Sequence, residues 1–266
     1  MEALQVNINK KQISFPLTWK GLNKSQLVNV AYALRETWKW ESINALTEAD
    51  KDHVASEILK LKAFTVKILL GVSWKVYDRM NCSQLAEFIP HTNWLFEQKY
   101  PNALVLPEFQ HRFVKYTLHN EGLTGWTLTK YLTVEKHLQR VMKTATEESL
   151  LNFLAQICTN KKGENPAAKK LKGINPNLAS ALMLQYLGAR KRVVDLFPHV
   201  FPQSENTKNE GDATNWGVVI SEFIAPKYGN NLNIAKDAPL YDALGVLNTA
   251  IQKNKEMAKK YKEAQK

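Results

Sequence analysis

The sequence predicts a mainly α protein, a multi-helix globular bundle that carries a small N-terminal β-hairpin. Residues 126–159 indicate two amphipathic helices joined by a tight turn, and other segments repeat the same helical spacing of apolar residues. Apolar and polar residues alternate near the N-terminus, as in strands with one buried face. A chain of 266 residues can bury a core, as one large domain or two small ones.

Two short alternating runs form the predicted hairpin. Residues 4–8 and 13–15 place aliphatic and aromatic side chains on one face, and the polar residues between the runs suit a turn. Pro16 ends the second run, because a proline cannot donate a hydrogen bond to a ladder.

Two long helices are predicted to follow the hairpin. Asn23 is a suitable N-cap for a helix over residues 24–38, while residues 47–50 open a second helix that Gly71 ends. The buried faces are predicted to contain Leu27, Val30, Ala31 and Leu34 in the first helix, and Val54, Ile58, Leu61, Phe64 and Ile68 in the second. Trp38 and Trp40 lie between the helices, where a core or rim position is favoured over stacking on nucleobases.

Prolines punctuate the next region, which follows a short helix that begins near Cys82. Pro90, Pro101 and Pro107 stand among many aromatic and aliphatic residues. The pattern predicts a packed crossover, with a short strand pair as one arrangement, and a loop over residues 116–125.

The central segment gives the clearest helical pattern. The first apolar stripe contains Leu128, Tyr131, Leu132, Val134, Leu138, Val141 and Met142, and the second contains Leu150, Leu151, Phe153, Leu154, Ile157 and Cys158. Residues 144–147 predict a capping box between the helices. A short connection makes such helices pack antiparallel, and other helices must cover both stripes.

The segment after the central helices changes composition sharply. Residues 159–175 are rich in lysine and glycine and predict a basic, flexible loop. Pro176 suits the first position of the next helix, which Phe197 and Pro198 end. Its buried side is predicted to contain Leu178, Leu182, Met183, Tyr186, Leu187 and Val194. Residues 203–212 are polar and acidic and favour an exposed loop.

Two further helices complete the chain. Asp212 or Thr214 is predicted to cap a helix at Trp216, a Gly/Asn turn over residues 227–233 follows it, and the last helix begins at Asp237. The buried face of the last helix is predicted to contain Leu240, Leu244, Leu247 and Ile251. Beyond Gln252 the helix becomes rich in lysine, so this end is predicted to project as a solvated arm.

Composition divides the chain into three parts. These are residues 1–158, with the hairpin and a helical body; residues 159–175, the basic loop; and residues 176–266, a C-terminal helical part with a lysine-rich end. We expect them to fold as one cooperative unit.

The net charge of +11 indicates either an acidic partner or a surface kept soluble by lysine. The two cysteines, Cys82 and Cys158, are far apart, which argues against a disulfide framework and fits a reducing compartment. No signal-peptide pattern and no apolar window of about 18 residues occur, so we expect no membrane association.

Sequence motifs for catalysis are missing. The histidines form no HExxH pattern and the cysteines no CxxC pair, so no metal site is expected. No phosphate-binding glycine loop and no GxSxG turn occurs. We therefore expect a protein without catalytic residues or cofactors, although an enzyme with an unfamiliar site stays an alternative.

Three basic patches are the candidate contacts for an acidic partner or for nucleic acid. They comprise Lys161, Lys162, Lys169, Lys170 and Lys172 in the loop, then Arg190, Lys191 and Arg192, and finally Lys253, Lys255, Lys259, Lys260 and Lys262 near the C-terminus. Cations of this kind give affinity for phosphates without sequence specificity. Aromatic residues are not interleaved with the lysines, which argues against base stacking.

Three groups of short motifs occur in a consistent order along most of the chain. They are FPLTWKGL at 15–22 followed by SQL at 25–27; GLTGWTL at 122–128; and TNW at 214–216, YGN at 228–230 and APLY at 238–241. In order and spacing, they resemble proteins encoded in tail gene clusters of Bacteroidetes phages and prophages. Lys130 and Lys136 depart from that pattern, where acidic residues would be expected.

The resemblance implies a non-enzymatic phage tail-assembly protein, chaperone-like, that acts through protein–protein contacts. The alternatives are a permanent virion component near the connector or tail, and a nucleic-acid-binding protein that uses the basic loop and the C-terminal lysines. Expected partners are other phage or virion proteins, a second copy of the chain, or nucleic acid. The expected location is the host cytoplasm during assembly, or the virion.

Overall fold

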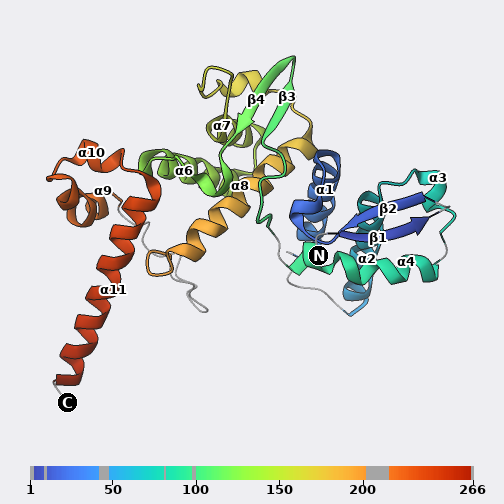
Figure 1. The fold of residues 1–266 in the computed structure, drawn as a ribbon, viewed down its shortest axis with the longest axis horizontal. Coiled ribbons are helices and arrows are strands. Elements are labelled where there is room, and N and C mark those ends of the chain that lie inside the picture. The colour runs from blue at the N-terminus through green and yellow to red at the C-terminus, as the bar shows by residue number, and fades with distance from the viewer. Residues whose placement is uncertain are drawn as a thin grey trace. The chain divides into compact units, whose positions relative to one another are not determined.

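The computed structural model describes residues 3–8, 11–41, 48–80, 82–97, 100–201 and 216–264 (Figure 1). The predicted fold class is confirmed, since most described residues are helical and a two-stranded antiparallel sheet lies near the N-terminus. The expectations for the side chains of Trp38 and Trp40, the acidic loop at 203–212 and the caps at Asp212 and Thr214 fall outside the described residues.

The chain forms two compact units that interleave along the sequence. Unit 1 contains residues 1–118 and 158–189, and unit 2 contains residues 119–157 and 190–266. Each unit is described by itself below. The division of the chain by composition, at residues 158 and 175, stays a prediction.

Unit 1 begins with the predicted β-hairpin. Strands β1 (Ala3–Ile8) and β2 (Lys11–Pro16) pair antiparallel, and Leu4 lies opposite Phe15. Pro16 is the last strand residue, as its missing N–H requires. The Phe15 ring is fully buried 5.4 Å from the ring of Phe88, so the hairpin supplies part of the core.

Helix α1 (Lys24–Glu41) starts with a reciprocal cap. The Asn23 side chain accepts a hydrogen bond from the Gln26 N–H, and the Gln26 side chain accepts one from the Asn23 N–H, each at 2.9 Å. The side-chain amide of Gln26 (Nε2) also donates to the carbonyl of Leu69, at the end of helix α2 (Glu48–Leu70). The predicted buried face of α1 is confirmed.

The predicted face of α2 is only partly right. Its five predicted residues are half-buried, whereas Thr65, Val66, Leu69 and Leu70 are the fully buried ones. The buried positions are concentrated in the second half of the helix, where α2 packs against α1 and β2. Gly71 ends the helix as predicted, with a left-handed φ of 63°.

Short helices connect α2 to a small second sheet in unit 1. The helices include α3 (Trp74–Tyr77), α4 (Cys82–Phe88) and α5 (Asn93–Glu97). The strands of the sheet are β3 (Glu108–His111), β4 (Val114–Leu118) and β5 (Cys158–Thr159). The strands run antiparallel in the order β3-β4-β5. The strand pair β3–β4 agrees with one predicted arrangement, but the predicted loop at 116–125 is wrong at its start, because residues 116–118 complete β4.

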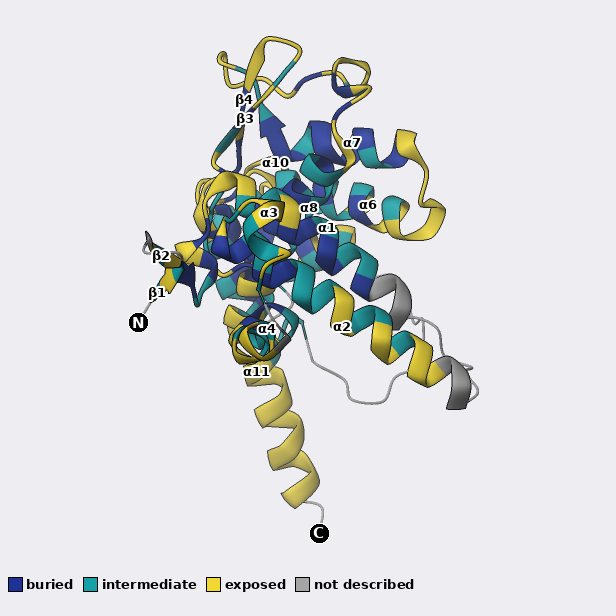
Figure 2. Cartoon of the chain, turned by 90° about the vertical axis from the view of Figure 1, so that its right-hand side faces the viewer, coloured by how far each residue is buried: buried dark blue, intermediate teal, exposed yellow. Residues whose placement is uncertain are grey.

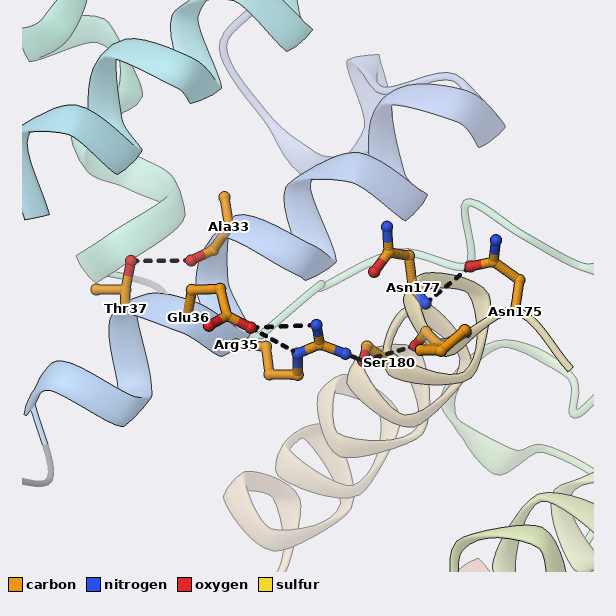
Figure 3. A network of polar contacts seen from close by, with 8 residues as sticks. Ala33, Arg35, Glu36, Thr37, Asn175, Asn177 and Ser180 are labelled. Atoms are coloured by element: carbon orange, nitrogen blue, oxygen red, sulfur yellow. Dashed lines mark hydrogen bonds and ion pairs between the residues drawn. The ribbon is translucent and has the colours of Figure 1, made fainter. Parts of the chain in front are cut away.

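Helix α8 (Pro176–Leu196) packs closely within unit 1 over its first two-thirds. The Asn175 side chain accepts hydrogen bonds from the N–H groups of Asn177 and Leu178, which confirms the predicted start. Arg35 of α1 donates to the Ser180 hydroxyl at 3.2 Å (Figure 3). Leu182 and Tyr186 are buried as predicted, but the other four predicted residues are half-buried.

The predicted apolar stripe of α8 is therefore too narrow. Ala181, Leu184, Gln185, Gly188 and Ala189 are buried as well, so the helix is covered on several sides. The boundary between the two units falls within this helix, after Ala189.

Unit 2 contains the central helical hairpin, which is confirmed. Helices α6 (Leu128–Thr144) and α7 (Glu147–Ile157) pack on each other, and most predicted stripe residues are buried or half-buried. Met142 is an exception, with 70% of its side chain exposed. It lies in the last turn of α6, just before the turn between the helices.

The predicted capping box between α6 and α7 is displaced by two residues. Thr146, not Thr144, caps α7, because its hydroxyl accepts the Ser149 N–H and its carbonyl accepts the Ser149 hydroxyl. The Thr144 hydroxyl donates instead to the carbonyl of Arg140 within α6. Ala145 between the helices adopts a left-handed φ of 48°.

The remaining elements of unit 2 are α9 (Trp216–Val219), the π-helical turn η5 (Ile220–Ile224), the 3-10 helix η6 (Ala225–Tyr228), α10 (Leu232–Lys236) and α11 (Leu240–Ala264). The predicted Gly/Asn turn is present at Gly229 and Asn230, but it leads into α10, a short helix that was not predicted. Leu240, Leu244 and Leu247 are buried as predicted, and Ile251 is half-buried.

Candidate functional site

The three predicted basic patches have different surroundings. In the patch at residues 190–192, every cation has a carboxylate partner within unit 2. Arg190 donates to both carboxylate oxygens of Glu135, at 3.0 and 2.8 Å. Lys191 pairs with Asp195 at 2.8 Å, and Arg192 pairs with Glu121 at 3.3 Å. These residues carry charge already matched by acid, which makes them weak candidates for phosphate contacts.

The basic loop of unit 1 is folded by buried anchors and local hydrogen bonds. Leu171 is fully buried in the 3-10 helix η4 (Ala168–Leu171), and Ile174 is 8% exposed. The Asn160 side chain accepts hydrogen bonds from the N–H groups of Lys162 and Glu164. The segment predicted to be flexible is thus a loop with defined turns.

The loop lysines are exposed on this folded support. Lys161, Lys162, Lys169, Lys170 and Lys172 are all in the exposed class. Within the described residues, none of the five forms an ion pair with a carboxylate. Their charges are therefore available to an external anion.

The third patch lies on the last turns of α11. Every residue from Gln252 to Ala264 is exposed, which agrees with the predicted solvated arm (Figure 2). The arm carries Lys253, Lys255, Lys259, Lys260 and Lys262. Met257 and Tyr261, one helical turn apart, add an apolar stripe, and these residues are 51% and 71% exposed.

Sequence reasoning missed one exposed residue of unit 1. Phe113 lies in the two-residue turn between β3 and β4, and the residue is 97% exposed. In the same hairpin, the hydrogen bond from Lys115 lowers the pKa of the Glu108 carboxyl from its ordinary value. Strong alternation around residues 109–116 could have located the hairpin, but not the exposure of its turn.

Aromatic residues of unit 1 also surround Lys67. The Lys67 ammonium lies 2.7 Å from the centroid of the Trp74 ring, and Phe64 stacks on the same tryptophan at 6.1 Å. Partial loss of solvent lowers the pKa of Lys67. Trp74 is 56% exposed, but its contacts with Lys67, Phe64 and Tyr77 account for its position.

Unit 2 contains a small cavity of about 260 Å³ beside the Arg190–Glu135 ion pair. Phe201, Trp216 and Phe223 contribute its aromatic lining. Tyr131 also lines the cavity, and burial raises the pKa of its hydroxyl. The cavity is smaller than most small-molecule sites, which measure roughly 300–1,000 Å³.

The described residues contain neither a metal-binding cluster nor a membrane-spanning helix. No group of three or more histidine, cysteine, aspartate or glutamate side chains could hold a metal ion. No described helix is long and apolar enough to cross a membrane. The exposed cationic surfaces carry mostly unpaired lysines, which makes them candidates for contact with an external partner in the described part of the chain.

Comparison with known proteins adds no assignment. No protein family, curated protein or solved structure matches the chain.

Proposed function

We propose that this chain is a non-enzymatic, chaperone-like protein of phage tail assembly that acts through protein–protein contacts. The motif order along the sequence suggests the biological setting. The exposed end of α11 carries the proposal, because it offers a contact surface that nothing else in the described structure uses.

The end of α11 has the chemistry of a docking helix. An amphipathic helix binds in a groove through apolar anchors spaced three or four residues apart. Met257 and Tyr261 have that spacing, and five lysines surround them. An acidic groove on an unassembled tail protein would match both features. Such binding would cover apolar surface on the partner until assembly proceeds in the host cytoplasm.

The closest alternative is a permanent virion component, in which the same helix contacts a neighbouring subunit. The two functions differ in where the protein is found after assembly. A chaperone occurs in complex with unassembled tail protein and is absent from particles, whereas a virion component occurs in particles at a fixed copy number.

The decisive measurement is quantitative mass spectrometry of purified particles and of the particle-free lysate. We expect the protein in the lysate, bound to a tail protein, and not in particles. The M257S/Y261S variant should lose that complex while keeping the melting temperature of the parent. Stoichiometric presence in particles would replace the chaperone role by the structural one, and absence both from particles and from any tail-protein complex would reject both.

A further inference from the structure

The turn between β3 and β4 holds an exposed aromatic ring in a strained backbone. Arg112 and Phe113 form the two-residue turn, and their φ angles are 47° and 64°. Two-residue hairpin turns with positive φ at both positions favour Asn-Gly or Asp-Gly, since a bulky side chain is disfavoured there. Phe113 contributes no packing to the fold that would offset this strain, because its side chain is 97% exposed.

The basic loop lies against this turn. A β-carbon placed on Gly173, at the end of the loop, would be 3.4 Å from Nη2 of Arg112. Strand β5 leads into the start of the same loop and pairs with β4 through Thr117 and Thr159. The approach of Gly173 to Arg112 thus places the end of the lysine-rich loop beside the turn that carries the exposed ring.

The charge at this end of the sheet is mostly positive. The loop contributes five exposed lysines without an ion pair in the described structure, and Arg112 adds a guanidinium. The acids of the hairpin and of the loop are engaged. Glu108 of β3 pairs with Lys115 at 2.5 Å and with Lys24 at 3.7 Å, and Glu164 of the loop accepts a hydrogen bond from the Asn160 side chain.

We propose that Phe113 and the basic loop form a binding site for single-stranded nucleic acid, in which the ring stacks on a base and the lysines contact phosphates. Proteins that bind single strands without sequence preference combine these two elements, an aromatic platform and a cationic track. The site lies in unit 1 and uses none of the residues of the proposed docking helix, so it stands independently of the chaperone role.

Two other partners fit the site less well. Lysine is depleted at the centres of protein–protein interfaces, where arginine, tyrosine and tryptophan are preferred, whereas it binds phosphate readily as a point charge. An anionic membrane would use the lysines, but it needs several apolar or aromatic anchors for a stable contact, and this surface offers chiefly one ring. The test below separates all three.

The first experiment measures binding of the full chain to a fluorescent 20-nucleotide oligothymidylate and to a duplex of the same length, at salt concentrations from 50 to 200 mM. The key variant is Phe113→Asn, because asparagine tolerates positive φ and should preserve the turn while removing the ring. Loss of one base stack should weaken single-strand binding ~5- to 100-fold, with little effect on the duplex. Phe113→Tyr should retain affinity, and Met142→Gln removes another exposed apolar side chain (70% exposed, against 97% for Phe113) elsewhere as a control.

The second experiment locates the phosphate contacts with two variants of equal charge. One replaces Lys161, Lys162, Lys169, Lys170 and Lys172 by glutamine, and the other replaces Lys253, Lys255, Lys259, Lys260 and Lys262. Each removes five positive charges, which takes the net charge from +11 to +6 (11 − 5). The loop variant should reduce the slope of log affinity against log salt by about 0.7 for each lost phosphate contact, whereas the arm variant should leave that slope nearly unchanged.

Several results would overturn the proposal. They are no oligonucleotide binding at 50 mM salt, unchanged binding of the Phe113→Asn variant, or equal losses in the loop and arm variants. Binding to vesicles that contain phosphatidylserine, without binding to the oligonucleotide, would assign the surface to a membrane. Retained binding of an acidic tail protein by the loop variant, tested alongside, would show that the two surfaces act separately.

Discussion

Helices α8 and α11 are both long and both rich in cations, yet they use those cations differently. In α8, the cations at residues 190–192 are held by carboxylates, and the preceding turns are buried on several sides. In α11, only the first half is packed, and the lysines from Lys253 onward are exposed. In the arm only Lys259 has a carboxylate partner among the described ion pairs, Glu263 at 3.9 Å. A run of basic residues in a sequence therefore indicates an available surface only when the fold leaves most of those residues unpaired.

The sharpest test of this difference is the same substitution in each helix. A β-carbon on Gly188 of α8 would lie 1.9 Å from the carbonyl oxygen of Pro101, whereas one on Gly245 of α11 would meet nothing closer than 4.0 Å. Gly188→Ala should lower the free energy of unfolding by about 3 kcal/mol or more, because rigid backbone blocks the new methyl group. Gly245→Ala should raise it by about 0.5–1 kcal/mol through helix propensity.

Chemical denaturation with urea measures both effects. Equal and small changes in the two variants would contradict the close packing of α8 against Pro101. A large loss in both would show that α11 is held as tightly as α8 at this point.

Lowering the pH should destabilise the packing around the start of α11 and leave its exposed end unaffected. His119 is 6% exposed, and burial lowers its pKa from 6.5 to about 4. Its ring packs edge-on against Trp126, whose carbonyl accepts the N–H of Leu240 at the start of α11. As the pH falls, the unfolded chain binds the proton before the folded chain does. The stability that neutral His119 contributes is therefore complete above about pH 6.5 and is lost as the pH falls towards 4. The free energy of unfolding should fall by about 3 kcal/mol over this range.

Urea denaturation at several pH values between 7 and 4 measures this loss. The His119→Gln variant should remove most of the pH dependence in that range. A slope that persists in the variant would assign the effect to other groups.

Breaking the ion pair between Arg190 and Glu135 should cause an intermediate loss in the free energy of unfolding. Glu135 is 14% exposed and Arg190 is 37% exposed, so water screens the pair only partly. Arg190→Gln should lower the free energy of unfolding by about 2 kcal/mol, less than a fully buried pair would lose. Lys191→Gln, which breaks an exposed pair one residue later, should change it by less than about 0.5 kcal/mol.

A double substitution checks the origin of the Arg190 effect. Glu135→Gln combined with Arg190→Gln should recover part of the loss, because no carboxylate then lacks its guanidinium. Losses that simply add would mean that the two side chains stabilise the unit through separate contacts.

The smallest change in stability is expected from substitutions at the end of α11. Replacing Lys253, Lys255, Lys259, Lys260 and Lys262 by glutamine should leave the melting temperature within about 2 °C of the parent, since none of these side chains is packed. Differential scanning calorimetry measures this value. A drop comparable with that of Arg190→Gln would show that the arm packs against other parts of the chain.

Local patterns predicted most of the helices, and contacts between distant residues explain what they could not predict. The cap at Asn23 and the pairing of α6 with α7 depend on residues that lie close together in the sequence, so their spacing was sufficient. The partners of Arg190 and Arg192 lie 55 and 71 residues away, which no local pattern reveals. The same reason hid the surroundings of the β3–β4 turn, because Gly173 lies 61 positions (173 − 112) after Arg112, the residue whose side chain it approaches.

The two backbone hydrogen bonds between the starts of α6 and α11 have a consequence for the nascent chain. The N–H of Leu128 donates to the carbonyl of Ala238, and that of Leu240 donates to the carbonyl of Trp126, so α6 completes its first turn with residues made 110 positions later (238 − 128). Ribosomes add about 5–20 residues per second, which leaves α6 without these partners for roughly 5–20 s. During that interval the α6–α7 hairpin exposes an apolar face, and slower translation would lengthen its exposure to cellular chaperones and proteases.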